Sequence, residues 1–267
     1  MLGTFTVSRP TELGQALGLI GEDSLAYWGG TELFLAMKMQ LLTPGNLVDL
    51  KGIPQLREIR MNGDELVIGA GTTHDQIATD AVIRGAAGLL SSVTSRVGNS
   101  RVRAQGTIGG NLCFAEPRSD LATVLLALDA TVQLQSSSGQ RRLSITEFLL
   151  GPYWTAIESE ELLVAVCVPV PAATGVYLKF QFTERPSVAV TAVVSEGGQP
   201  CRLAIGAVAD VPALHTAESW DQFDAASIAA GIEPVPDLTG SVTYKRHLTE
   251  VLVNKAIAAV RAGERDG

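Results

Sequence analysis

The chain has 267 residues, of which 46% are hydrophobic and 18% are charged, and its formal net charge is −8. This composition can bury a sizeable core and excludes a largely disordered protein. The acidic balance and the lack of a Lys/Arg run argue against nucleic-acid binding, because such proteins turn basic stripes toward the phosphates.

The chain shows no targeting or membrane-spanning pattern. Its first ten residues lack the charged and apolar regions of a signal peptide, and no apolar run reaches the ~18 residues of a membrane span. The three cysteines, Cys113, Cys167 and Cys201, are too few and too dispersed to hold an iron–sulfur cluster or a zinc ion. We therefore expect a cytoplasmic protein with reduced, buried cysteines and no transmembrane segment.

The first predicted domain, residues 1–55, alternates strands and helices. Leu25–Trp28 is predicted as a short strand, after which Gly29-Gly30 turns the chain. In Thr31–Leu41 the apolar residues recur at i, i+3, i+4 and i+7, which predicts a helix. Leu47–Leu50 is the next predicted strand.

The second predicted domain, residues 56–170, starts with a hairpin. The turn signal Asn62-Gly63-Asp64 lies between the predicted strands Leu56–Arg60 and Glu65–Gly69. Ser119 or Asp120 is placed to cap a later helix. The remaining predicted helices and strands of this domain are His74–Asp80, Ala81–Ser92, Asp120–Leu128, Thr131–Gln135 and Leu162–Val168.

The sequence Pro169-Val-Pro171 predicts a boundary, beyond which residues 171–267 form a third domain. Interleaved strands and helices with recurrent hairpin signals favour an α+β fold over a doubly wound parallel sheet. The fingerprint G-x-G-x-x-G is absent, which disfavours a nicotinamide site of the Rossmann type. The predicted strands and helices of this domain are Val176–Phe182, Val188–Ser195, Cys201–Val208, Ser219–Ala230 and Arg246–Ala262.

Two Gly-Gly pairs, each leading toward a helix start, are the most informative motifs. Gly29-Gly30 is followed by Thr31, and the second pair lies in Thr107-Ile-Gly-Gly-Asn111, nine residues before Asp120. Glycine lets the chain turn with positive φ and lets backbone N–H groups approach an anion. One such pair is most simply an ordinary tight turn, but two pairs together with Asp120 predict a dinucleotide site.

At these residues the chain resembles the FAD-binding, or medium, subunit of the molybdenum hydroxylases. That family includes aerobic carbon monoxide dehydrogenase and the flavin domain of xanthine dehydrogenase. The resemblance covers essentially the whole chain. Its motifs here are Ala26-Tyr-Trp-Gly-Gly-Thr-Glu-Leu33, Thr107-Ile-Gly-Gly-Asn111 with Asp120, Lys179, and Tyr244-Lys-Arg-His-Leu248.

The resemblance implies a two-subdomain FAD-binding fold of the vanillyl-alcohol-oxidase-like type, followed by an α+β domain with a three-stranded antiparallel sheet. Two departures, Ala104 for an expected Asn and Ser187 for an expected Asp, put finer flavin contacts in question. The implied cofactor-binding residues are Ala26, Tyr27, Trp28, Gly29, Gly30, Thr31, Glu32, Leu33, Gly98, Thr107, Ile108, Gly109, Gly110, Asn111, Asp120, Leu163 and Lys179.

The resemblance also implies partners and a role. FAD would be held on this chain, with a molybdopterin cofactor on a large subunit and [2Fe–2S] clusters on a small subunit, in a dimer of heterotrimers. Electrons would pass from the clusters through FAD to a terminal acceptor. We predict no catalytic acid, base, nucleophile or metal ligand on this chain.

Alternatives remain open for the chain and for single residues. The chain is alternatively a stand-alone FAD-dependent oxidoreductase with its own substrate pocket, or a nucleotide-binding assembly module. His74 is either a general base or, as we favour, a residue at a helix start capped by Thr73 or Asp75. Trp28 is either a ligand contact or a core aromatic, and Lys179 is either near the flavin or a solvated strand residue.

Overall fold

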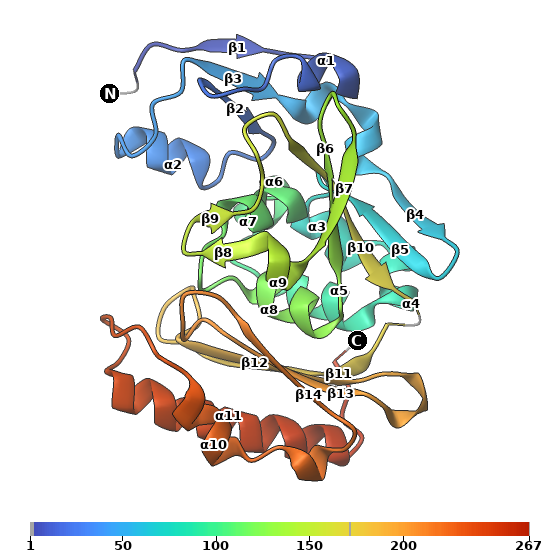
Figure 1. The fold of residues 1–267 in the computed structure, drawn as a ribbon, viewed down its shortest axis with the longest axis vertical. Helices are drawn as coiled ribbons and strands as arrows, with labels where there is room; N and C mark the ends of the chain where they lie inside the picture. The colour runs from blue at the N-terminus through green and yellow to red at the C-terminus, as the bar shows by residue number, and fades with distance from the viewer. Residues whose placement is uncertain (1–2, 171, 267) are drawn as a thin grey trace.

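The computed structural model describes residues 3–170 and 172–266, and its elements form three stacked layers (Figure 1). Pro171, one end of the predicted boundary, lies outside these residues. A small sheet lies at the top, a larger sheet with most of the helices in the middle, and a third sheet at the bottom. None of the helices in the described residues combines the length and hydropathy needed to cross a bilayer.

The top layer is a parallel sheet in the order β1-β3-β2. Its helix α2, Leu33–Lys38, is shorter than the predicted Thr31–Leu41. The helix ends because Gln40 adopts φ 61, so that the N–H of Leu41 bonds to Ala36 O at 2.9 Å. The other elements of this layer are β1 Thr6–Ser8, α1 Leu13–Leu17, β2 Ser24–Tyr27 and β3 Asn46–Asp49.

The middle layer is an antiparallel sheet in the order β4-β5-β10-β6-β7. The predicted hairpin forms around Gly63 (φ 58), but its first strand starts later than predicted. Residues Pro54–Arg57 make a 3-10 turn that buries Leu56, and the strand begins only at Ile59. The strands are β4 Ile59–Asn62, β5 Glu65–Gly69, β6 Thr131–Gln135, β7 Gln140–Ser144 and β10 Leu162–Pro169.

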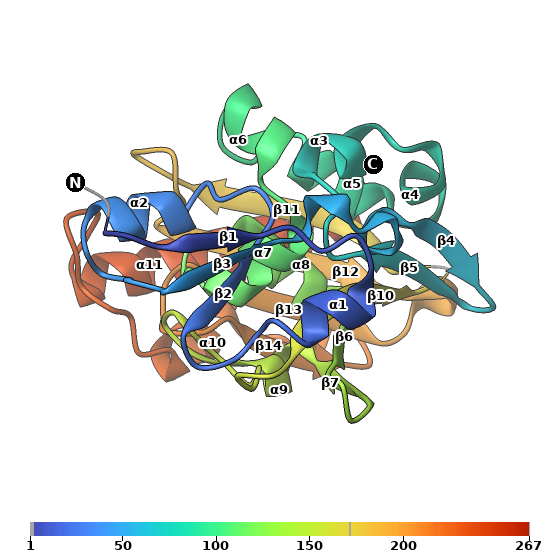
Figure 2. The same ribbon diagram turned by 90° about the horizontal axis from the view of Figure 1, so that it is seen from above.

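Helices and a short hairpin surround the middle sheet. In the view from above, the strands of the top sheet are seen in front of α7 and α8, which belong to the layer below (Figures 1 and 2). These elements are α3 His74–Thr79, α4 Ala81–Ala86, α5 Gly88–Thr94, α6 Ser100–Gln105, α7 Ile108–Phe114, α8 Asp120–Ala127, α9 Ile145–Phe148, β8 Leu149–Gly151 and β9 Trp154–Thr155.

The bottom layer is an antiparallel sheet in the order β11-β12-β13-β14, one strand more than predicted. The additional strand β14, Ala213–Ala217, is an edge strand with no buried position, so its sequence lacks the apolar run that predicted the others. The other elements are β11 Thr174–Phe180, β12 Val188–Val194, β13 Cys201–Gly206, α10 Ala225–Gly231 and α11 Val242–Arg261.

The middle and bottom layers share one hydrophobic core. Helix α8 packs against β12 and β13, and a single cluster of buried residues extends from Leu66 on β5 to Ala204 on β13. A second cluster joins Val48 of the top sheet to Val164 of β10. The three layers are therefore packed directly on one another, and helices α6, α7 and α8 lie between the outer sheets.

Candidate functional site

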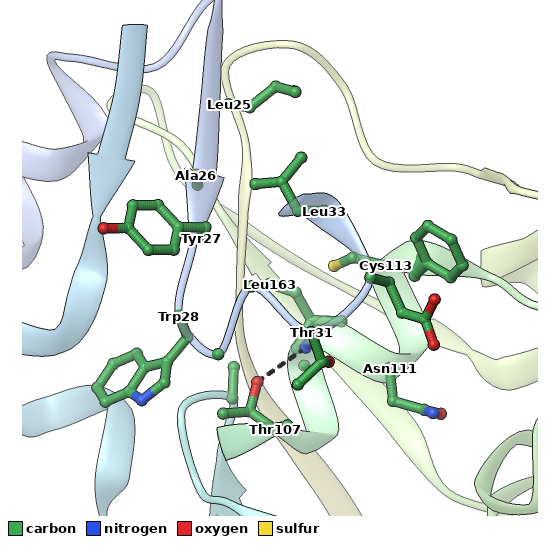
Figure 3. Close-up of a pocket in the computed structure, with 18 of the residues that line it drawn as sticks. Leu25, Ala26, Tyr27, Trp28, Thr31, Leu33, Thr107, Asn111, Cys113 and Leu163 are labelled. Carbon is green, nitrogen blue, oxygen red and sulfur yellow. Dashed lines mark hydrogen bonds between the residues drawn. The ribbon is translucent and has the colours of Figure 1, made fainter. Parts of the chain in front are cut away.

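A cavity of about 570 Å³ lies between the top layer and helices α6 to α8 (Figure 3). This volume falls in the range of small-molecule sites. Every cofactor residue predicted from the sequence lines it except Ile108 and Lys179. Ile108 is fully buried in the shared core, and Lys179 contacts a lining residue instead of the cavity itself.

The first Gly-Gly pair forms a tight turn directly on the cavity wall. A Cβ on Gly29 would lie 2.0 Å from Gln105 O, and Gly30 has φ +67, so both positions require glycine. The backbone N–H groups of Gly30, Thr31 and Glu32 donate to no acceptor in the part of the chain that the structure describes. This loop therefore offers unpaired backbone donors to an anionic group in the cavity.

The second Gly-Gly pair is not a turn, which corrects the prediction made from its sequence. Gly109 and Gly110 lie in the first turn of α7, and the pair has no positive φ. The N–H of Gly109 donates to Ala70 O at 2.9 Å, and that of Gly110 to Thr107 Oγ1 at 3.1 Å. The backbone donors of Gly109 and Gly110 are therefore already used.

Close packing explains the glycine at position 109. A Cβ there would lie 2.6 Å from the Cβ of Ala70 and 2.8 Å from its carbonyl oxygen. The residue lets α7 lie directly on the chain that follows β5. Nearby, Asn111 accepts from Ser119 Oγ at 2.7 Å through Oδ1, and its side chain lines the cavity (Figure 3). Thr107 and Asn111 can thus contact a ligand through their side chains.

Asp120 is held at the cavity by two donors from β11. Ser119 caps α8 by accepting from Ala122 N, which leaves the Asp120 carboxylate free to face other groups. The hydroxyl of Tyr177 donates to Asp120 Oδ1, and Lys179 Nζ donates to the same oxygen at 3.1 Å. Burial, followed by the adjacent Asp120 charge, raises the pKa of Tyr177 well above its usual value, so it remains a donor.

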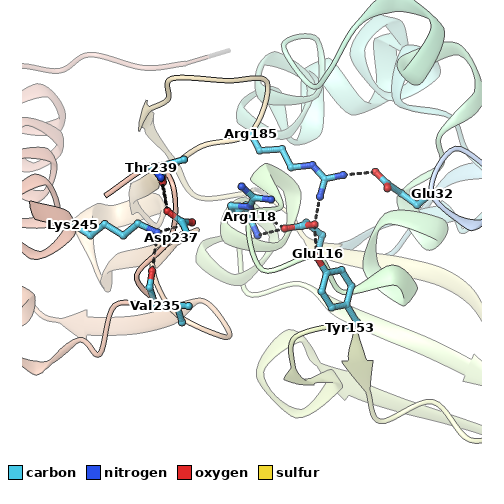
Figure 4. A network of polar contacts seen from close by, with 9 residues as sticks. All are labelled: Glu32, Glu116, Arg118, Tyr153, Arg185, Val235, Asp237, Thr239 and Lys245. Carbon is cyan, nitrogen blue, oxygen red and sulfur yellow. Dashed lines mark hydrogen bonds and ion pairs between the residues drawn. The ribbon is translucent and has the colours of Figure 1, made fainter. Parts of the chain in front are cut away.

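A charged network at the edge of the cavity joins all three layers (Figure 4). Arg185, in the loop between β11 and β12, donates to Glu32 Oε1 at 2.7 Å and also to Glu116. Glu116 further accepts from Arg118 Nε at 3.1 Å and from Tyr153 OH at 2.9 Å. Of this network, only Glu32 was predicted as a site residue; its side chain makes no cap hydrogen bond to α2 and pairs with Arg185.

His74 lies in the cavity wall at the first position of α3. Thr73 caps this helix in a capping box with Gln76, as the helix-start interpretation expects. The imidazole is only 3% exposed. Burial, and to a lesser extent the Arg103 charge, lowers the pKa of His74 to about 4. The ring is therefore neutral near pH 7, and no carboxylate among the described residues pairs with it to make it a strong base.

Two other residues singled out from the sequence are mainly packing residues. Trp28 is buried in the core beneath the top sheet, where its ring packs on Gly71 and the Arg57 guanidinium stacks 4.7 Å from the ring centroid. The Cys113 side chain lines the cavity, but burial raises its pKa to about 12, so it remains an unreactive thiol. Cys167 and Cys201 are buried, as predicted, whereas Cys113 is only partly buried, which corrects the expectation for that residue.

Comparison with known proteins places the chain in a family. The family model for the FAD binding domain in molybdopterin dehydrogenase matches residues 3–171. The chain belongs to this family. The top and middle layers that enclose the cavity are the part that the model describes.

Relatives of the family extend the similarity to the bottom layer. The carbon monoxide dehydrogenase medium chain of Hydrogenophaga pseudoflava is 30% identical over 279 residues, 97% of each chain. That of Afipia carboxidovorans is 28% identical and covers 97% of this chain and 98% of its own. The structure of reconstituted CO dehydrogenase from Oligotropha carboxidovorans matches with TM-score 0.91 and 28% identity, over 98% of this chain and 99% of that chain. The α+β fold predicted from the sequence is thus confirmed along its whole length.

Proposed function

We propose that this chain is the FAD-binding electron-transfer subunit of a multi-subunit molybdenum hydroxylase. Its family is defined by an FAD-binding domain of molybdopterin dehydrogenases, and its relatives along the full length are medium chains of such enzymes. The observation that supports this function best is the loop of unpaired N–H groups at Gly30 to Glu32 on the wall of a large cavity.

The residues present fit FAD. Gly29 and Gly30 form a cradle that any Cβ would fill, and the free N–H groups beside them suit a diphosphate. Asp120 keeps Oδ2 available for a sugar hydroxyl while Tyr177 and Lys179 occupy Oδ1. When bound, FAD supplies one-electron and two-electron redox chemistry, and the protein binds and orients it.

We assign each predicted domain a part in this binding. Residues 1–55 carry the diphosphate loop, and residues 56–170 carry Thr107, Asn111 and Asp120 on the opposite wall. Residues 171–267 contribute Lys179 and Arg185 and cover one side of the site. This division remains a proposal, because the core is continuous between the second and third segments.

The proposed assembly places the other cofactors elsewhere. The molybdopterin cofactor belongs to a large subunit and the [2Fe–2S] clusters to a small subunit, and this chain connects the clusters to a terminal acceptor. We further propose a dimer of such heterotrimers. We keep the cytoplasm as the proposed location, on the strength of the sequence alone.

The proposal is tested on the purified chain through its flavin content and the Asp120→Asn substitution. We expect a yellow protein with one FAD per chain and no substrate turnover in the absence of partners. Asp120→Asn removes a charge-assisted hydrogen bond, so FAD affinity should fall about tenfold or more. Asp129→Asn, in an exposed ion pair with Arg202, is the matched control and should leave affinity unchanged.

Three results would contradict the proposal. A chain that cannot be loaded with FAD would favour a nucleotide-binding module without redox activity. Substrate turnover by the isolated chain would favour a stand-alone oxidoreductase. Equal FAD affinity in the Asp120 and Asp129 variants would show that Asp120 does not contact the cofactor.

A further inference from the structure

The motif Tyr244-Lys-Arg-His-Leu248 supports the family resemblance, but cofactor binding does not explain it. It lies at the start of α11 in the bottom layer, and none of its residues lines the cavity. Lys245 is nevertheless only 1% exposed, and its Nζ lies 2.9 Å from Asp237 Oδ2 and donates to Val235 O at 2.8 Å (Figure 4). A buried ammonium is costly unless it is paired, so these contacts fix the loop before α11 against the helix.

The start of α11 presents Tyr244 to the end of β11. Ser241 caps the helix and accepts a hydrogen bond from the Tyr244 N–H at 3.3 Å. A Cβ on Gly240 would lie only 2.7 Å from Tyr244 Cδ1, so the preceding turn packs directly on the ring. The ring also meets Phe180, the last residue of β11, edge to face, with 6.4 Å between the ring centroids. Tyr244 therefore connects the turn before its helix to β11.

A second aromatic contact continues from β11 into the loop of residues 181–187, which leads to β12. The rings of Phe180 and Phe182 are edge to face, with their centroids 4.9 Å apart. The loop is closed at its base by Ser187 N, which donates to Phe180 O at 2.8 Å. Aromatic pairs in this geometry are stabilising beyond the area that they bury. Phe180, Phe182 and Tyr244 thus form an aromatic cluster that joins this loop to α11.

The same loop carries Arg185 to the edge of the cavity. Arg185 follows Phe182 by three residues, and its guanidinium donates to Glu32 Oε1 at 2.7 Å and also to Glu116. Among residues 181–186, only Arg185 forms hydrogen bonds with other described parts of the chain. The loop therefore has two attachments beyond its base, which are the aromatic cluster and the bridge made by Arg185. Because ordering the loop costs conformational entropy, the attachment at the cluster makes the Arg185 bridge easier to form.

We propose that Tyr244 is a positioning residue, which acts through the aromatic cluster to hold loop 181–187 in the conformation from which Arg185 bridges the layers. Tyr244 does not line the cavity, so any effect on a bound cofactor must pass through this loop. The effect on FAD rests on the proposed function, whereas the order of the loop is a property of the chain without a ligand. The C-terminal motif thereby gains a role at the edge of the site, because Lys245 fixes the turn on which the Tyr244 ring packs.

The experiment combines one measurement without cofactor and one with it. Glu184 is exposed in the loop, so cleavage after it by a glutamate-specific protease, mapped by mass spectrometry, reports how often the loop opens in the flavin-free full-length chain. FAD release from the loaded chain is followed by fluorescence after dilution. Loss of one edge-to-face contact in Tyr244→Leu should speed up both processes about two- to fivefold, and Tyr244→Phe, which keeps the ring, should restore the rates of the unchanged chain.

A double substitution distinguishes positioning from a general loss of stability. In the Arg185→Gln background, Tyr244→Leu should not accelerate FAD release further, because the bridge that it supports is already lost. Phe182→Ala disrupts the same cluster at a side chain that is 63% exposed, so the test does not depend on the folding of the leucine variant. Phe223→Leu is the matched control, because its ring pairs with Trp220 at 5.4 Å in the same layer but outside the cluster. Circular dichroism checks the fold of each variant.

The outcomes separate this inference from the function on which it rests. If the unchanged chain binds no FAD, the proposed function fails, and cleavage after Glu184 still decides the role of Tyr244. If Tyr244→Leu and Phe182→Ala are cleaved no faster than Phe223→Leu, or if Tyr244→Leu speeds up FAD release equally with and without Arg185, the positioning role is overturned. Faster cleavage together with non-additive FAD release supports it.

Discussion

Replacing Arg185 with Gln should speed the release of FAD. The guanidinium bridges Glu32 of the top layer and Glu116 of the middle layer, and it comes from a loop of the bottom layer. The three residues line the cavity, and the Arg185 and Glu32 side chains are 34% and 36% exposed, so the substitution should loosen the edge of the cavity while global unfolding changes little.

The size of the effect on FAD release follows from the solvent exposure of the two paired side chains. The Arg185 side chain is 34% exposed and Glu116 only 9%. An exposed ion pair contributes ~0.2–1 kcal/mol and a fully buried pair several times more, so this partly screened bridge should contribute about 1 kcal/mol. Since 1.4 kcal/mol is a factor of ten, FAD dissociation should accelerate about fivefold.

The assay is the release of FAD from the loaded chain, followed by its fluorescence after dilution, over a salt series. Arg118→Gln is the matched control, because Arg118 also contacts Glu116 but does not reach the top layer. The wild-type rate should rise with salt, whereas the Arg185→Gln rate should depend on salt much less. Equal rates for wild type and Arg185→Gln, or equal effects of the two substitutions, would refute the bridging role.

Two further predictions concern stability. Gly109→Ala should lower the free energy of unfolding by about 1–3 kcal/mol in urea titrations, because its Cβ would overlap Ala70; an unchanged midpoint would contradict the packing role. For His74, the unfolded chain takes up a proton below its ordinary pKa of about 6.5, whereas the folded chain does so only near 4. Stability should therefore fall as pH drops from 6.5 to 4, by up to about 3 kcal/mol, and His74→Leu should flatten this part of the profile.

Much of the fold follows from local pattern. The strand at Leu162–Val168 and the hairpin at Gly63 were predicted because a buried apolar run and a turn signal are local properties. The edge strand β14 was missed because Ala213-Leu-His-Thr-Ala217 is too short of apolar residues to form an apolar run, and none of its positions is buried. The start of β4 was displaced because Pro54 initiates a 3-10 turn that competes with an extended chain.

The site could be predicted from the sequence only where the motif itself determines the backbone conformation, without contacts to distant residues. Gly29-Gly30 was interpreted correctly as a turn, but Gly109-Gly110 was not. A glycine pair in a sequence does not distinguish positive φ from close packing, and at position 109 the contact with Ala70 decides. The Arg185 bridge had no local signal at all, because its partners Glu32 and Glu116 lie 153 and 69 residues away in the chain.

Tyr177 shows how one more functional residue can be inferred from strand geometry. Lys179 was identified by resemblance, and residues two apart in a strand point to the same side of the sheet. Tyr177 therefore had to lie beside Lys179, facing the same carboxylate. Because the phenol and the ammonium both donate to Oδ1 of Asp120, the carboxylate is oriented before any ligand arrives, and Oδ2 is the oxygen left to accept from a hydroxyl.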